Sequence, residues 1–380
     1  MLRYSSRIHW NLESSALSQA VSAAREGVLD LTVSNPTDSG FAYPSGVLES
    51  LTDPRAMVYD PNPLGLPSAR EAVSEYYGGR YSPDQILLTA STSEAYSWLF
   101  KLLCDPGDEV LIPRPSYPLF EFLADLECVR TVQYPMHYDH GWFIDVAALE
   151  SLITPRTRAI VFVNPNNPTG SYLKPGEFEF LQRTGLPLIF DEVFLDYAFD
   201  TPQPVYTPHF LLSGLSKVSG LPQMKLGWIV VNDAASLPRL ELIADTFLSV
   251  GTPVQYALPA LLDARHEVQA QIRARTKRNL DHLRARVLHV EGGWTAIVQM
   301  PRTRTEDEWV LHLLQDHNVL VQPGYFYDFE SEAYLIISLL TEPATFAEGA
   351  RRIILAATHA EEVPHRSDAA HYDNHDDVRR

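Results

Sequence analysis

Short, mainly apolar runs alternate with helical patterns through the first two thirds of the chain. The runs cover residues 86–89, 109–112, 159–163, 188–190 and 228–231, and helical patterns at 94–104 and 176–183 lie between several of them. Strands that are apolar throughout, rather than alternating with polar residues, are typical of a parallel sheet covered on both faces. The pattern therefore predicts an α/β fold with a doubly wound, mostly parallel sheet, whose ligands bind at the carboxyl ends of the strands.

The pattern changes after about residue 253. Residues 254–287 predict one long helix interrupted by Pro259, followed by a strand at 295–300, a helix at 306–316, a strand at 334–340 and a helix from Pro343. This fits a smaller α+β domain, joined by an N-terminal helix at 12–26. We expect residues 1–40 to pack with the small domain, 41–252 to form the large ligand-binding domain, 253–360 to form the small domain, and the polar tail 361–380 to be disordered.

Composition excludes several classes of protein. The 380 residues carry a formal net charge of −18, which argues against nucleic-acid binding because phosphate backbones attract clustered Lys and Arg. No run of about 18 apolar residues occurs, so no membrane span is expected. Cys104 and Cys128 form neither a disulfide framework nor a metal-ligand pattern, and no secretory signal is evident. These observations predict a cytoplasmic protein without a metal site.

Residues 213–228, SGLSKVSGLPQMKLGW, contain the most reactive candidate side chain. Lys217 follows the apolar run 210–212, and a buried ammonium must be paired or lose its proton. A neutral lysine attacks carbonyl carbon and forms a Schiff base. Lys225, eight residues later, can hold a phosphate. The pair indicates an aldehyde cofactor with a phosphate group, such as pyridoxal 5'-phosphate, although a surface loop with two solvated lysines would read similarly.

Two further strand-end loops fit the same cofactor. Ser91, Thr92 and Ser93 precede a helix, whose free N-terminal amides and dipole attract anions. The alternative is a simple helix N-cap. In the loop PRPSYP at 113–118, Tyr117 lies between prolines and can stack on a flat ring, or can be a structural turn aromatic.

Amides and an acid follow the next two predicted strands. The loop NPNNPTG at 164–170 combines Asn, Pro and Gly so that amide donors are held at defined positions. Asp191 follows a buried strand, where a carboxylate is costly unless it meets a cation. A protonated pyridine nitrogen is such a cation, and the pairing makes the ring an electron sink. An ion pair that closes a helix is the alternative.

The motifs NPNNPTG, DEVF and SKxxGxxxxKxGW, in this order, resemble those of the fold-type I pyridoxal-phosphate-dependent aminotransferases, class I/II of the aspartate aminotransferase superfamily. The resemblance extends from about residue 35 to 349. It implies a transaminase that moves an amino group between an amino acid and a 2-oxo acid by a ping-pong Schiff-base mechanism. It further implies that Lys217 forms the imine and moves the proton, Asp191 holds the pyridinium, and Asn167 binds the ring's phenolic oxygen.

The resemblance implies further contacts to the cofactor. Tyr117 would stack on the ring. The phosphate would be bound by Thr92, Ser93, Lys225 and also by Ser91, Ser213 or Ser216. Tyr59 matches the tyrosine that reaches the phosphate of the partner subunit, which implies a homodimer.

Three positions depart from the family pattern. Lys225 stands where the family has an arginine, which keeps the charge but loses the bidentate geometry. Phe194 replaces the tyrosine that donates to the phenolic oxygen. Ile336 occupies the position of the arginine that binds the substrate's α-carboxylate, and no Lys or Arg occurs between Arg304 and Arg351.

Three hypotheses follow from the missing arginine. The first is an amino-acid aminotransferase whose substrate carboxylate is held by another cation, such as Arg7 or Arg114. The second is a pyridoxal-phosphate enzyme for amines or for substrates without a free α-carboxylate. The third is a non-catalytic binding or regulatory protein. The intact set of Lys217, Asp191, Asn167 and Tyr117 argues against it. We favour the first because amino-acid transamination is the commonest activity of the family.

Overall fold

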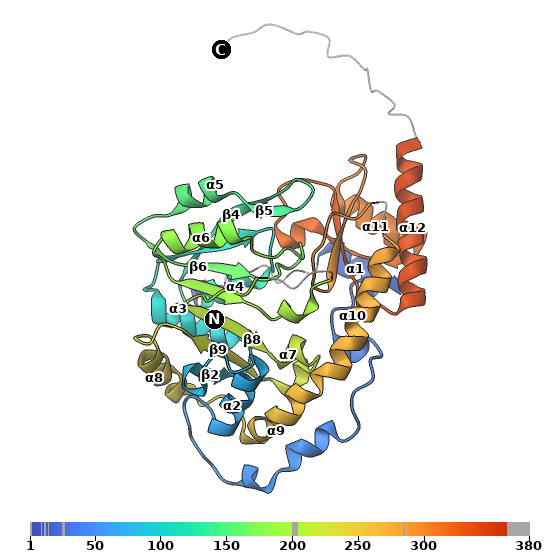
Figure 1. Ribbon diagram of the computed structural model, residues 1–380. Helices are drawn as coiled ribbons and strands as arrows, with labels where there is room; N and C mark the ends of the chain where they lie inside the picture. Colours follow the sequence, from blue (N-terminus) through green and yellow to red (C-terminus); the bar gives the residue numbers. More distant parts are fainter. Residues whose placement is uncertain are drawn as a thin grey trace, which may run out of the picture.

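A large twisted sheet forms the centre of the computed structural model, which describes residues 2–8, 10, 13, 15–24, 27–199, 204–283 and 286–362 (Figure 1). Its eight strands lie in the order β2-β9-β8-β7-β6-β3-β4-β5. Their bounds are β2 Ile86–Thr89, β3 Glu109–Arg114, β4 Arg130–Tyr138, β5 Trp142–Ile144, β6 Thr157–Val163, β7 Leu188–Asp191, β8 Phe210–Gly214 and β9 Gly227–Val231.

The sheet is mostly parallel, which confirms the predicted fold class. The pairs β3–β4, β3–β6, β6–β7 and β7–β8 are parallel, while β9 runs antiparallel to β8 and β2, and β5 runs antiparallel to β4. All four residues of β2 and all five of β8 and β9 are buried, as expected for strands covered on both faces.

Helices cover both faces of this sheet. They are α2 Pro67–Tyr76, α3 Thr92–Leu103, α4 Leu119–Leu126, α5 Val146–Leu152, α6 Pro175–Arg183, α8 Leu237–Phe247 and α9 Thr252–Asp263. One core packs α3, α4 and α8 on the sheet, with Leu99, Phe120 and Leu240 at its centre. A second core packs α2 and α9, and a third packs α5 and α6.

A smaller region is built around a three-stranded antiparallel sheet in the order β10-β13-β12, with β10 Thr295–Gln299, β12 Gln322–Pro323 and β13 Tyr334–Ser338. A short parallel pair, β1 Leu29–Asp30 and β11 Val319–Leu320, lies beside it. The helices are α1 Ala16–Ser22, α10 Arg265–Asp281, α11 Glu306–His317 and α12 Pro343–Glu362. Leu31 shares this region's core with Trp309 and Ile353, so the segment around β1 packs with the C-terminal part.

The helix expected over residues 254–287 is two helices. The break lies at Ala264, between α9 and α10, whereas Pro259 lies inside α9. The two helices bury side chains in different cores: Leu258 and Leu261 of α9 pack with α2, and Ile272 of α10 packs in a separate cluster. In Figure 1, α10 runs from the large-sheet region towards α12. The division at residues 252 and 253 therefore stays a prediction, with α9 packed on the large-sheet side.

Some sequence predictions fall on residues outside the described ranges. These include Leu12 on the N-terminal helix and nearly all of the tail 361–380. Within the described ranges, no helix combines the length and apolarity needed to cross a bilayer. The same ranges contain no group of three or more His, Cys, Asp or Glu side chains arranged to bind a metal ion.

Candidate active site

A cavity opens where the carboxyl ends of the parallel strands meet the small sheet. It contains about 1030 Å³ of empty space, its open mouth included, which is enough for a cofactor and a small substrate. Seven of the predicted residues line it: Ser91, Thr92, Tyr117, Asn167, Asp191, Ser216 and Lys217. Asp191 ends β7, and the other six residues lie shortly after the ends of β2, β3, β6 and β8, so the sheet order brings them together.

Lys217 lies on α7, Leu215–Val218, the single helical turn that follows β8. Its Nζ lies 4.9 Å from the centroid of the Trp294 ring and 5.5 Å from that of Phe194, and has no hydrogen-bond acceptor among the described residues. Burial lowers the pKa of Lys217 to about 8, with Asp191 opposing the shift. A substantial fraction of this amine is therefore neutral and nucleophilic near neutral pH.

Asp191 is the last residue of β7 and is buried. Its Oδ1 accepts from the Val193 backbone N–H at 3.1 Å, and its Oδ2 accepts from the Tyr96 hydroxyl at 3.1 Å. Burial raises the pKa of Asp191 to about 6 despite these bonds. A carboxylate held this way is stabilised by a cation brought into the cavity. Tyr96 was missed by the sequence analysis, although it lies one helical turn after Thr92.

The asparagines of the NPNNPTG loop have different roles. Asn164 is fully buried, and its Oδ1 accepts from the Leu173 backbone N–H at 3.1 Å. Asn166 is also buried and bonds within its own loop. Asn167 lines the cavity; its Oδ1 accepts from Thr295 Oγ1 at 3.4 Å, and its Nδ2 has no acceptor among the described residues. Only the third asparagine presents a donor to a ligand.

The start of α3 and the β8–β9 pair form a polar end of the cavity. Ser91 is the N-cap of α3, with its Oγ accepting from the Glu94 backbone N–H at 3.2 Å, so the N-cap alternative is also correct. At Gly227 a Cβ would lie 3.0 Å from the carbonyl oxygen of Ser213 and 3.2 Å from the carbonyl carbon of Ser91. The backbone therefore closes tightly around this end, and a side chain at position 227 would require its neighbours to shift.

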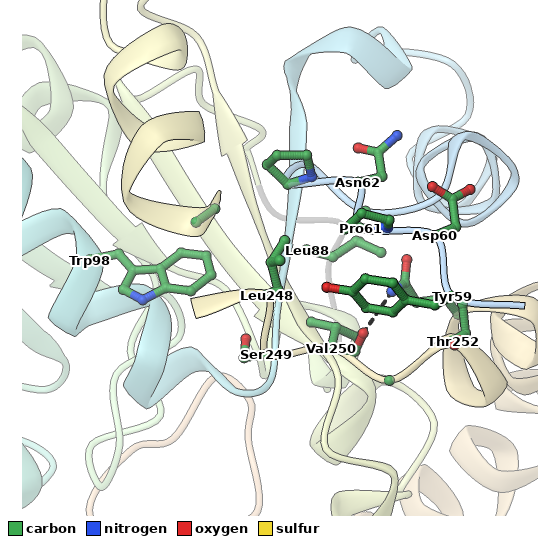
Figure 2. Close-up of a pocket in the computed structure, with 15 residues that line it drawn as sticks. Tyr59, Asp60, Pro61, Asn62, Leu88, Trp98, Leu248, Ser249, Val250 and Thr252 are labelled. Atoms are coloured by element: carbon green, nitrogen blue, oxygen red, sulfur yellow. Dashed lines mark hydrogen bonds between the residues drawn. The ribbon is translucent and has the colours of Figure 1, made fainter. Parts of the chain in front are cut away.

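Four other residues considered for the cofactor do not line the cavity. Lys225 is exposed, with φ 49°, directly after the short helix η7, Pro222–Met224. Ser93 is not among the residues that line the cavity, and the buried Ser213 Oγ has no hydrogen-bond partner within the part of the chain that the structure describes. Tyr59 is 78% exposed and borders a separate hollow together with Val250 and Thr252 (Figure 2).

The wall from the small sheet was missed by the sequence analysis. It consists of uncharged side chains, namely Trp294, Thr295, Gln322, Tyr327 and Ser338. Lys217 and Asp191 are the only charged side chains among the residues that line the described cavity. No short motif marks this wall, because its residues come from three strands and the short helix η8, Gly324–Tyr327.

The expected position of the carboxylate arginine is apolar. Ile336 is 1% exposed and packs in a hydrophobic cluster that includes Ile297. The two replacement cations considered above bind elsewhere. The Arg114 Nε donates to the Asp328 carbonyl at 2.7 Å, and an Arg7 guanidinium nitrogen donates to the Leu126 carbonyl at 3.0 Å. Neither arginine lines the cavity.

The sequence profile of the family "Aminotransferase class I and II" matches residues 26–353 of the chain. The chain belongs to the class I and II aminotransferases. It is 30% identical over 277 residues to the glutamate-pyruvate aminotransferase AlaA of Escherichia coli K12, covering 67% of this chain and 68% of that protein. It is 29% identical over 265 residues to an alanine aminotransferase of Mycobacterium tuberculosis, covering 64% and 62%.

Solved structures of aminotransferases share the fold. An alanine aminotransferase from Pyrococcus furiosus superposes with a TM-score of 0.81 at 24% identity, covering 94% of this chain and all of that chain. An aminotransferase from E. coli gives a TM-score of 0.82 at 23% identity, covering 95% and 99%.

Class I and II aminotransferases use pyridoxal 5'-phosphate, and the cavity fits this cofactor. Lys217 offers an amine without a hydrogen-bond partner, and Asp191 offers a buried carboxylate that needs a cation. The tight backbone at Gly227 and the N-terminus of α3 suit a phosphate. The chain is therefore a pyridoxal-phosphate-dependent aminotransferase of fold type I.

Proposed function

We propose that this aminotransferase moves an amino group from an amino acid to a 2-oxo acid in two half-reactions at one site, a ping-pong mechanism. The observation that carries the proposal is that Lys217 and Asp191 line the same cavity. Glutamate and pyruvate are the first substrates to test, because the E. coli relative is named for them. Pyruvate and alanine carry one carboxylate each, which suits a cavity with a single basic side chain among its lining residues.

We assign roles to the residues of the large-sheet wall. When bound, pyridoxal phosphate supplies an aldehyde that captures amines and a ring that accepts electrons from the substrate Cα. Lys217 would bind the aldehyde, and its amine, released when the substrate's amine takes its place, would move a proton at the substrate Cα. Asp191, which accepts a hydrogen bond from Tyr96, would hold the ring nitrogen in its protonated form. Asn167 would donate from Nδ2 to the phenolic oxygen, and Tyr117 would cover one face of the ring.

The phosphate contacts remain part of the proposal. Thr92, Ser91 and Ser216 border the polar end of the cavity and are assigned to the phosphate together with the amides at the start of α3. Ser93 is assigned through its backbone N–H. Lys225 is exposed and lies outside the cavity lining, and its assignment to the phosphate rests on its place in the motif.

A homodimer is also proposed, with Tyr59 reaching the partner's cofactor. Three consecutive residues, Met57, Val58 and Tyr59, are strongly exposed to solvent. A run of exposed apolar and aromatic side chains is typical of a surface that another protein covers. The hollow in Figure 2 places this loop beside the segment that precedes α9. A second copy of the chain would cover both segments. The free cysteines Cys104 and Cys128 support the proposed location in the reducing cytoplasm.

The proposed function is tested with purified protein and pyridoxal phosphate. Incubation with glutamate and pyruvate should yield 2-oxoglutarate and alanine in equal amounts, measured by chromatography. Each half-reaction alone should change the absorbance of the bound cofactor without the second substrate, as a ping-pong mechanism requires. Failure of glutamate, alanine and a panel of other amino acids to change the absorbance would contradict the proposal.

A further inference from the structure

The register of the small sheet places Gln322 beside the position where an arginine was expected. Gln322 on β12 pairs directly with Ile336 on β13, and Ile297 on β10 pairs with Ile336 from the other side. The side chains of directly paired residues lie on one face, with Cβ atoms about 4.5–5.5 Å apart. Gln322 therefore shares the face and the neighbourhood of Ile336.

Gln322 and Ile336 lie in different environments. Gln322 lines the cavity, whereas Ile336 is buried in the apolar cluster with Ile297. Ser338, two residues further along β13, and its partner Thr295 lie on the same face and also line the cavity. The cavity thus borders this face of the sheet around Ile336, and Gln322 is the polar side chain next to it.

The carboxamide of Gln322 is held in one orientation. The Tyr327 hydroxyl donates to Gln322 Oε1 at 2.6 Å. Burial raises the pKa of Tyr327 to about 12, so the hydroxyl keeps its proton at neutral pH. Gln322 Nε2 carries two hydrogens and has no acceptor among the described residues. A fixed amide donor is therefore available on this wall.

The neighbouring hydroxyls donate to backbone carbonyls instead. Thr295 Oγ1 donates to the Pro168 carbonyl at 3.1 Å, and Ser338 Oγ donates to the Val33 carbonyl. A hydroxyl has one hydrogen to donate, so neither is free for a ligand. Ser34, exposed in the loop after β1, is the remaining hydroxyl on this side of the cavity.

We propose that Gln322 Nε2 binds an oxygen of the substrate's α-carboxylate, in place of a cationic side chain on β13. This inference rests on the proposed function and names the residue that selects the substrate at the same site. A neutral amide also donates to the carbonyl oxygen of a primary amide, because its hydrogen bond does not require an anionic acceptor. The enzyme should therefore distinguish an amino acid from its amide only weakly.

The test compares the holoenzyme with its Gln322→Leu variant in single-turnover reactions followed by cofactor absorbance. The substrates are alanine and ethylamine, which differ by the carboxylate. Loss of one hydrogen bond to a charged group should lower the alanine-to-ethylamine ratio of specificity constants about tenfold. The loss should come from weaker binding of alanine rather than from a slower maximal rate. Gln299→Leu, an exposed glutamine on the same sheet, is the matched control and should keep the wild-type ratio.

A second readout does not depend on turnover. Saturation-transfer NMR should show propanoate binding the wild-type holoenzyme about tenfold more tightly than the Gln322→Leu variant. Tyr327→Phe, which releases the amide without removing it, should lower the substrate ratio by a smaller factor, about threefold. Circular dichroism and cofactor absorbance establish that each variant is folded and loaded.

The outcomes separate the two proposals. If the wild type converts amino acids and Gln322→Leu keeps both the substrate ratio and propanoate binding, the role of Gln322 is wrong while the proposed function stands. If the wild type converts no amino acid, the proposed function fails and the role of Gln322 fails with it. Equal slowing of alanine and ethylamine would also contradict the role, because it would show a general disturbance of the cavity.

Discussion

The two walls of the cavity differ in charge and in where they come from in the chain. The wall formed by the large sheet carries two charged side chains, Asp191 at the end of β7 and Lys217 on α7 directly after β8. The wall formed by the small sheet is uncharged and presents Trp294, Gln322 and Tyr327. We propose that this difference separates two tasks, with the amino-transfer chemistry on the first wall and selection of the substrate on the second.

This separation explains how the chain stays within its family without the expected arginine. The cofactor-binding wall keeps the residues that the chemistry requires. On the opposite wall, Ile336 joins the apolar core, and Gln322 is its partner across the strand pair. In our proposal the contact to the substrate's carboxylate lies at Gln322, while the residues assigned to the reaction stay in place. Each of the following experiments disturbs one wall and measures the task assigned to it.

The largest effect is expected at Lys217. Lys217→Ala removes both the amine that binds the cofactor and the group that moves the proton, so turnover should fall by more than about a thousandfold. The visible absorbance band of the bound cofactor should disappear as well. Lys101→Ala, at a lysine on α3 that pairs with Glu127, is the control and should keep turnover and spectrum. Retained turnover in Lys217→Ala would contradict the assignment of this wall.

A smaller loss is expected at Asp191. Asp191→Asn keeps the size of the side chain but removes the charge that stabilises a protonated ring nitrogen. Turnover should fall about a hundredfold to a thousandfold, the range seen when one electrostatic contact to the reacting group is lost. Asp191→Glu, which keeps the charge, should recover part of the loss. Steady-state kinetics at saturating cofactor measure the turnover of both variants. Equal turnover of the wild type and Asp191→Asn would contradict the role assigned to the Asp191 charge.

The pH dependence of cofactor capture tests the environment of Lys217. The neutral amine reacts with the aldehyde, and burial lowers the pKa of Lys217 to about 8. The capture rate by cofactor-free protein should therefore rise about tenfold per pH unit below pH 8 and level off above it. Stopped-flow absorbance from about pH 6 to about pH 11.5 follows this rate across both the shifted and the ordinary pKa of lysine. A midpoint near 10.5, the ordinary pKa of lysine, would show an unperturbed amine.

The smallest effect is expected at Ile336, and it sharpens the contrast with Gln322. Ile336→Val removes one buried methylene from the apolar cluster, which should lower the free energy of unfolding by about 1 kcal/mol. The ratio of specificity constants for alanine and ethylamine should stay unchanged. Urea denaturation and single-turnover kinetics measure the two quantities. A changed ratio with unchanged stability would place Ile336, rather than Gln322, against the substrate.

The large-sheet wall could be predicted from the sequence because its residues lie in contiguous motifs. Lys217, Asp191 and Asn167 each follow an apolar strand within a few residues, so the rule for parallel sheets brings them to one edge. Lys225 stays a prediction, since its backbone has φ 49° and the residue is exposed and outside the cavity lining. The spacing of the motif indicates how far Lys225 lies from Lys217 along the chain, but not where its side chain lies in the fold.

The small-sheet wall could not be predicted in the same way. The position of Gln322 is set by the antiparallel register between β12 and β13, and β12 is only two residues long. Tyr327 fixes the amide from a short helix after β12, and Trp294 approaches Lys217 from before β10. These contacts depend on tertiary packing, which the periodicity of a single segment does not encode. The break between α9 and α10 was misplaced for the same reason, because it depends on which core each helix enters.

The central claim is that neutral donors select the substrate while the charged wall performs the reaction. The most direct measurement compares alanine with alaninamide in single-turnover reactions of the wild-type holoenzyme. We expect both substrates to convert the cofactor, with specificity constants within about tenfold of each other, because a neutral amide at Gln322 donates to either oxygen. Preference for alanine by about a thousandfold or more would show that a cation binds the carboxylate, and would contradict the account.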